Sequence, residues 1–167
     1  MTLSGSPSPI NSRALIDSRG PRFAAGLSTV VLAVVLVTSS TVLIAAQAVV
    51  FALGAFAGLR WHPYGALYRT LVAPRLSPPT EREDPAPVRF SQGLGFAFAA
   101  VGVLGYATGL TALGMTVTAL ALGAAFLNAA FGFCLGCEIY LRLPERWRSW
   151  ATFTPHNTSN TERGAAA

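Results

Sequence analysis

Four long apolar runs dominate the pattern of hydrophobic and polar positions along this chain. They lie at residues 23–38, 41–59, 90–107 and 112–141. A helix needs about 20 residues to cross about 30 Å of hydrocarbon, and about 17 is near the lower limit. The pattern therefore predicts an all-α membrane protein, a bundle of four transmembrane helices.

Uncharged turns join these runs in pairs. Ser39 and Ser40 separate the first two runs, and residues 108–111 separate the last two. Turns this short predict two tight helical hairpins. A cleaved signal peptide is the alternative for the first run, with residues 46–48 as its cleavage site, but the apolar stretch is longer than the core of a signal peptide.

The segment at residues 60–89 connects the two hairpins and is polar. Trp61, Tyr64 and Tyr68 alternate with arginines, which is typical of a short interfacial helix with aromatic anchors. Residues 77–87 are rich in proline, which interrupts a helix, so we expect an exposed loop there.

The predicted domain organisation has one folded part and two tails. Residues 22–143 form the four-helix transmembrane domain, and we expect residues 1–21 and 144–167 to be disordered cytoplasmic tails. Within the first tail, residues 17–22 directly precede the first apolar run and can dock against it.

Composition and charge place the bundle in a membrane and orient it. Hydrophobic residues make up 52% of the 167 residues and charged residues 11%, whereas a soluble domain carries about 25% charged residues. The twelve basic residues are all arginines that flank the apolar runs, and neither short turn contains one. Because positively charged segments stay in the cytoplasm, we predict a multi-pass protein of the bacterial cell membrane with both termini cytoplasmic. The arginines form no compact stripe with stacking aromatics, so the sequence does not indicate nucleic-acid binding.

Candidate chemistry is confined to a polar cluster in the last apolar run. Cys134 and Cys137 are the only cysteines of the chain, and Glu138 follows them directly. On a continuous helix these three residues share a face, and Arg142 stands one turn beyond Glu138, where it can form an ion pair. The 22 residues from Ala112 to Cys134 correspond to about 33 Å of helix, which places the cysteines near the cytoplasmic boundary.

The reactivity of this Cys-x-x-Cys pair depends on where the helix ends. Thioredoxin-type motifs place the pair at a helix N-terminus, where the helix dipole lowers the thiol pKa. On a helix that continues to residue 141 the pair lies near the C-terminus and beside an acid, and both features raise the thiol pKa. A thioredoxin-like nucleophile is then unfavourable unless the helix breaks at Gly132 or Gly136. A dithiol that accepts electrons or sulfur from a more reactive partner is less penalised.

Other kinds of site find little support in the sequence. One Cys-x-x-Cys supplies half of a tetrahedral zinc site, and His62 and His156 are isolated candidates to complete it, so we expect no metal. Glu138 stands where a c-type haem motif requires histidine. Phosphate-binding, hydrolase and metalloprotease motifs are absent, so no cofactor is expected. His62 is interpreted as an interfacial residue.

Small and polar residues within the runs predict how the helices pack. Glycines four residues apart share a helix face and allow close approach, which we expect for the pairs 54/58, 105/109 and 132/136. Gln47 and Asn128 lie in the middle of apolar runs, and we expect them to hydrogen-bond across helices rather than to bind a ligand.

Several short motifs together resemble one known family, the bacterial membrane proteins of domain-of-unknown-function family 4395. The resemblance covers about residues 13–143 and rests on residues 17–23, 45–48, 63–65 and 126–129 and on the motif Cys-Leu-Gly-Cys-Glu-Ile-Tyr at 134–140. Ser18 stands where a proline is common in that family. The resemblance implies a four-helix membrane domain without an assigned reaction, whose members are often associated with thioredoxin-like and sulfurtransferase proteins.

Two functional hypotheses follow. In the first, the chain is a membrane protein with a cytosol-facing dithiol, in which Cys134 and Cys137 exchange electrons or sulfur with a thioredoxin-like or sulfurtransferase protein and Glu138 accepts a proton. In the second, it is a non-enzymatic membrane scaffold or small transporter component whose cysteines only pack. The sequence does not decide whether the protein is an enzyme.

Overall fold

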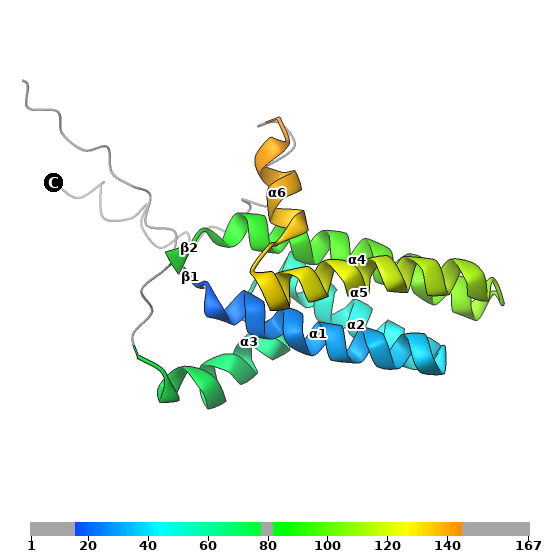
Figure 1. The fold of residues 1–167 in the computed structure, drawn as a ribbon, viewed down its shortest axis with the longest axis horizontal. Helices are drawn as coiled ribbons and strands as arrows, with labels where there is room; N and C mark the ends of the chain where they lie inside the picture. The colour runs from blue at the N-terminus through cyan, green and yellow to red at the C-terminus, as the bar shows by residue number, and fades with distance from the viewer. Residues whose placement is uncertain (1–15, 78–81, 145–167) are drawn as a thin grey trace, which may run out of the picture.

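The fold is a bundle of long helices, seen in a computed structural model that describes residues 16–77 and 82–144. Four helices lie side by side along one direction (Figure 1), namely α1 (Arg19–Thr38), α2 (Thr41–Ala52), α4 (Pro85–Ala107) and α5 (Thr111–Phe131). α1 packs against α2 and α5, and α4 packs against α2 and α5. The predicted all-α class is therefore confirmed.

Three of these helices, α1, α4 and α5, are long and apolar enough to cross a membrane. α2 continues into a π-helical turn, η1 (Leu53–Ala57), and together they form a shorter apolar helix, Thr41–Ala57. A multi-pass membrane protein agrees with this arrangement, while the count of four spans stays a prediction. Large apolar side chains such as Val37, Val42 and Leu104 are exposed on the outside of the bundle, where lipid would cover them.

The two hairpin turns follow from local hydrogen bonding. Ser39 adopts a left-handed conformation and its N–H donates to the Val35 carbonyl at 2.7 Å, which ends α1. The Ser40 hydroxyl accepts the N–H of Leu43 at 3.4 Å and caps α2. Between α4 and α5, the N–H of Thr108 donates to the Leu104 carbonyl.

The core of the bundle is small and lies between α1, α2, α4 and α5. Its buried residues are Leu32, Val35, Ile44, Ala48, Phe51, Ala99 and Ala121. Gln47 lies beside them and is only 1% exposed; its amide nitrogen donates to the Ser28 hydroxyl at 3.2 Å and its amide oxygen accepts the Tyr64 hydroxyl at 2.8 Å. The prediction that Gln47 bonds across helices is therefore confirmed.

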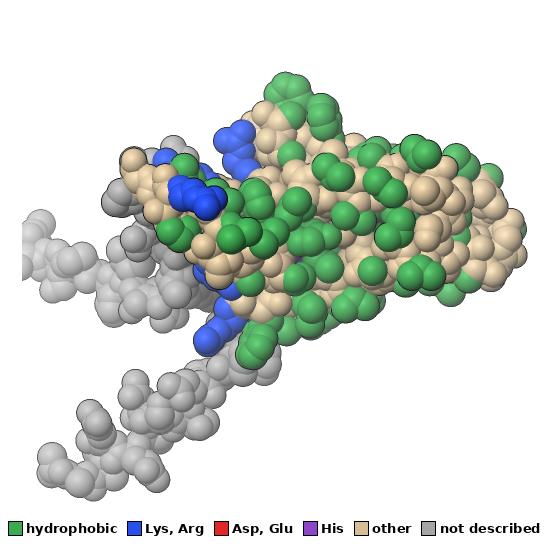
Figure 2. All heavy atoms as spheres, turned by 90° about the horizontal axis from the view of Figure 1, so that it is seen from below, with side chains coloured by type: hydrophobic (Ala, Val, Ile, Leu, Met, Phe, Trp, Pro, Cys, Tyr) green, Lys and Arg blue, Asp and Glu red, His purple; other side chains and the backbone are tan. Residues whose placement is uncertain are grey.

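The remaining elements gather at one end of the bundle. A helical stretch consists of α3 (Pro63–Leu67), η2 (Tyr68–Val72) and η3 (Ala73–Arg75), and β1 (Ile16–Asp17) pairs antiparallel with β2 (Arg82–Glu83). Figure 2 shows the arginine side chains gathered at this end of the molecule. The helix predicted in the 60–89 segment is thus present, and its position in a membrane interface stays a prediction.

The segment before α1 is bound to this end of the molecule. The Asp17 carboxylate accepts the N–H of Arg19 at 3.0 Å and the hydroxyl of Tyr68 at 2.7 Å. Because Asp17 binds the first free N–H of the helix, α1 begins at Arg19, four residues before the predicted start of the span. The rest of the predicted tails, residues 1–15 and 145–167, lies outside the described residues.

Candidate functional site

A break in the last apolar run determines the geometry of the candidate site. α5 ends at Phe131, and Gly132 adopts a left-handed conformation with φ 69° and ψ 12°. The N–H of Gly132 donates to the Asn128 carbonyl at 3.0 Å, and that of Phe133 to the Leu127 carbonyl at 3.4 Å. Glycine adopts this conformation without the steric penalty of a Cβ atom. The single helix predicted over residues 112–141 is therefore wrong at this point.

A second helix, α6 (Leu135–Arg142), follows the break and crosses the direction of the bundle (Figure 1). α6 packs against α4. A Cβ on Gly136 would lie 2.8 Å from the Cα of Ser91, and the Tyr140 ring is buried with its centroid 5.6 Å from that of Phe90. Close backbone packing at Gly136 and aromatic packing at Tyr140 therefore hold α6 against α4.

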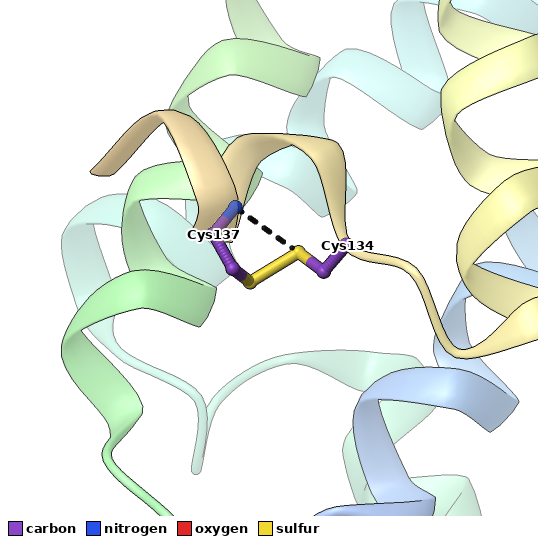
Figure 3. Close-up of a disulfide and its surroundings, with 2 residues drawn as sticks. All are labelled: Cys134 and Cys137. Carbon is purple, nitrogen blue, oxygen red and sulfur yellow. Dashed lines mark hydrogen bonds between the residues drawn. A yellow bond between two sulfur atoms is a disulfide. The ribbon is translucent and has the colours of Figure 1, made fainter. Parts of the chain in front are cut away.

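The cysteine pair lies at the N-terminus of α6. Cys134 is the N-cap residue in an extended conformation, and its Sγ accepts the N–H of Cys137 at 3.3 Å (Figure 3). A disulfide joins the two residues, whose Cα atoms are 5.2 Å apart. The prediction that the pair lies near a helix C-terminus was wrong, because the left-handed turn at Gly132 starts a new helix directly before it. The structure therefore presents the arrangement that was required for a thioredoxin-like pair.

Glu138 occupies the first turn of α6, next to the pair. Its carboxylate forms an ion pair with Arg142, whose guanidinium donates a hydrogen bond to it at 2.9 Å, as the spacing predicted. The Arg142 side chain is 79% exposed and that of Glu138 is 41% exposed, so the ion pair contributes at most about 1 kcal/mol to stability. Glu138 is thus held beside the cysteines while it remains in contact with solvent.

A cleft of about 560 Å³ adjoins the disulfide. It lies between α1, α4 and α5, and Cys134, Cys137 and Glu138 line it on the α6 side. Several polar side chains that sequence reasoning did not assign to the site also line it, among them Arg22, Asn128, Asp84 and Gln92. A volume between about 300 and 1,000 Å³ is usual for pockets that bind small molecules.

The glycine pairs have divided roles, which corrects the prediction that each pair shares a helix face. One member of each pair makes a close contact: Gly54 with His62, Gly105 with the backbone of Gly114, and Gly136 with Ser91. The other members, at positions 58, 109 and 132, have positive φ angles and follow helix ends. Each pair therefore consists of one glycine at a close contact and one glycine in a nearby turn.

His62 is buried, at 2% exposed, and its predicted position in a membrane interface stays a prediction. Its Nδ1 accepts the N–H of Gly65 at 3.3 Å and caps α3. Burial lowers the pKa of His62 to about 4, the nearby side chain of Gln92 opposes this effect, and the positive charge of Arg69 adds to it. His62 is therefore neutral at neutral pH. Over residues 16–77 and 82–144, no group of three or more His, Cys, Asp or Glu residues is placed to hold a metal ion.

Comparison with known proteins identifies the family. The model of one family, Domain of unknown function (DUF4395), matches residues 16–144. The chain therefore belongs to this family. Neither a curated protein nor a solved structure matches the chain.

Proposed function

We propose that this member of the DUF4395 family is a membrane-bound dithiol protein in which Cys134 and Cys137 cycle between a disulfide and two thiols. The observation that carries this proposal is the position of the pair at the N-terminus of α6, with the Cys134 Sγ accepting the N–H of Cys137. When the pair is reduced, a Cys134 thiolate has this N–H and the positive end of the helix dipole as stabilising groups. Both lower the pKa of a thiol and raise its nucleophilicity at neutral pH.

The reaction partner in this proposal is a soluble thioredoxin-like or sulfurtransferase protein. A thiolate of the partner attacks one sulfur of the Cys134–Cys137 disulfide, the S–S bond breaks, and a mixed disulfide forms. The second thiol of the partner then attacks the mixed disulfide and releases the dithiol. The partner docks on the arginine-rich end of the bundle, which faces the cytoplasm in the topology predicted from the arginine distribution. Glu138 is the nearby group that exchanges protons with the thiols.

Labelling of the two cysteines in inverted membrane vesicles tests the proposal. The full-length protein is treated with a maleimide, with and without prior reduction, over a series of pH values. We expect labelling only after reduction, with an apparent thiol pKa below about 8.5, the value of a free cysteine. The Cys134→Ser, Cys137→Ser double variant is the control for labelling at other sites.

The two single variants sharpen the test. Cys137→Ser leaves Cys134, whose sulfur accepts a backbone N–H, and Cys134→Ser leaves Cys137, whose sulfur has no such contact among the described residues. We expect the lower thiol pKa in Cys137→Ser. Absence of labelling under all conditions, in vesicles shown to be intact and inverted, would favour the alternative of a membrane scaffold with packing cysteines.

A further inference from the structure

The cleft beside the disulfide extends into the apolar part of the bundle. Phe98 of α4 and Ala121 of α5 line its deep part, far along their helices from the arginine-rich end. Side chains at its edge are apolar and exposed: Leu120 is 58% exposed, Phe133 48% and Leu141 58%. In a chain that crosses a membrane, exposed apolar residues face lipid. The cleft is therefore open to a ligand that arrives from the bilayer.

Two of the polar side chains that line the cleft, Arg22 and Asn128, lie near the cysteine pair, and Glu83, Asp84, Ser91 and Gln92 also line it. The guanidinium carbon of Arg22 lies 3.5 Å from the position of a Cβ on Gly132, which is two residues before Cys134. Asn128 lines the cleft one helical turn before Gly132. A guanidinium and an amide are both hydrogen-bond donors to carbonyl oxygens. The arrangement suits a ligand with carbonyl groups at the cysteine end and an apolar part along Phe98 and Ala121.

We infer that the cleft binds a lipid-soluble quinone, which the Cys134–Cys137 dithiol reduces. This inference rests on the proposed thiol–disulfide cycle and names its second reactant. A dithiol that becomes a disulfide releases two electrons and two protons, so a reactant in the cleft has to accept both. Quinones are lipid-soluble compounds that accept two electrons and two protons, and their carbonyl oxygens match the donors Arg22 and Asn128.

The reaction balances without any further reagent. The two S–H bonds of Cys134 and Cys137 break and one S–S bond forms, so the cysteines are oxidised by two electrons. The quinone takes up these electrons, and its two carbonyl oxygens each gain a proton to form the hydroquinone. Glu138 accepts a thiol proton as the S–S bond forms and exchanges it with the solvent that its side chain contacts, and the solvent supplies the matching proton to the hydroquinone. A soluble dithiol partner then reduces the disulfide again.

A quinone-reduction assay on the full-length protein in lipid nanodiscs tests the inference. The protein is reduced, freed of reductant and mixed without oxygen with a short-tailed benzoquinone that is substituted at every ring position, so that it cannot alkylate thiols. Loss of the quinone and loss of free thiols are followed together. The Cys134→Ser, Cys137→Ser variant measures the background. A parallel reaction with glutathione disulfide measures thiol exchange that does not need the cleft.

Two alanines of α5 supply a matched pair of cleft variants. Ala124 lines the cleft, whereas Ala119 is exposed and does not line it. Ala124→Leu fills space in the cleft, and we expect the ratio of quinone reduction to glutathione exchange to fall about tenfold, while Ala119→Leu keeps the wild-type ratio. If Ala124→Leu does not fold, Asn128→Leu, which removes an amide donor, makes the same comparison.

The outcomes separate this inference from the proposed function. One quinone reduced for each two thiols lost, with a lower ratio in the cleft variants, supports it. Normal exchange with glutathione disulfide without quinone reduction, or the same ratio in Ala124→Leu and Ala119→Leu, overturns the quinone inference and leaves the dithiol proposal standing. Thiols that react with neither reagent overturn both.

Discussion

Replacement of Gly132 by alanine tests whether the break between α5 and α6 controls the chemistry of the cysteine pair. Gly132 has φ 69°, and a left-handed conformation costs a residue with a Cβ atom about 1–2 kcal/mol. Space does not add to this penalty, because the nearest atom to the new Cβ would be the Arg22 guanidinium carbon at 3.5 Å, an ordinary contact. We therefore expect Gly132→Ala to destabilise the fold by about 1–2 kcal/mol through the backbone alone.

Gly123 is the matched control for this substitution. It lies inside α5, nine residues before Gly132, and a Cβ on it would meet no atom within 4 Å. Alanine is more favourable than glycine inside a helix by about 0.5–1 kcal/mol, so Gly123→Ala is expected to stabilise the protein. The same added methyl group in the same run is thus predicted to have opposite effects, with a difference of about 2 kcal/mol between the variants.

Thermal unfolding of the full-length protein, followed by circular dichroism, measures this difference. For a chain of this size, 1 kcal/mol corresponds to a shift in Tm of about 2–4 °C. A Gly132→Ala variant that also allows α5 to continue loses the helix N-terminus at the cysteines. Its reduced thiols should then label with maleimide more slowly at neutral pH than those of the wild type. A Tm of Gly132→Ala equal to or above that of the wild type would refute the assigned role of the break.

Three further predictions concern the elements around the site. Gly136→Ala introduces a Cβ 2.8 Å from the backbone of α4, so it should lower the Tm by an amount equivalent to about 1–3 kcal/mol. The control Gly26→Ala introduces a Cβ that meets no atom within 4 Å and should not lower the Tm. Equal effects of the two variants would contradict the close packing of α6. Tyr68→Phe removes the 2.7 Å hydrogen bond to Asp17 and should destabilise the protein by about 1–3 kcal/mol in the same assay, and an unchanged Tm would argue against this contact. His62 has a pKa of about 4 in the folded protein against an ordinary value of 6.5, so only the unfolded chain binds its proton between these pH values. The contribution of His62 to the free energy of unfolding is therefore largest above pH 6.5. The free energy of unfolding should fall by up to about 1.4 kcal/mol per pH unit from there toward pH 4. Melting curves at pH 4–7 should show this slope in the wild type and lose it in His62→Gln.

The all-α class and the helical hairpins could be predicted from the sequence because they depend on local quantities. The length of an apolar run sets how far a helix reaches, and the uncharged pair Ser39-Ser40 marks the turn between α1 and α2. Gln47 was also predictable, since a polar side chain in an apolar environment needs a hydrogen-bond partner. Its particular partners, Ser28 and Tyr64, lie 19 and 17 residues away and needed the fold.

The sequence left the break at Gly132 undecided, because local propensity does not determine it. Glycine occurs inside transmembrane helices as well as at their ends, and residues 133–141 are as apolar as many helical segments. The start of α6 is instead stabilised by tertiary contacts, in which Gly136 approaches the backbone of α4 and Tyr140 packs on Phe90. The hydrogen bond between Asp17 and Tyr68, 51 residues apart, was unpredictable for the same reason.

In the proposed cycle, the break prepares the two sulfurs for reaction with both reactants. In an unbroken helix the N–H of Cys137 would be bonded to the carbonyl of residue 133, and no donor would be left for a thiolate. The turn at Gly132 frees this N–H for the Cys134 Sγ and directs α6 across the bundle. The pair then lines the cleft together with Glu138, which forms an ion pair with Arg142. In the proposed cycle, a soluble dithiol and a lipid-soluble oxidant do not need to meet, because each reacts in turn with the same two sulfurs.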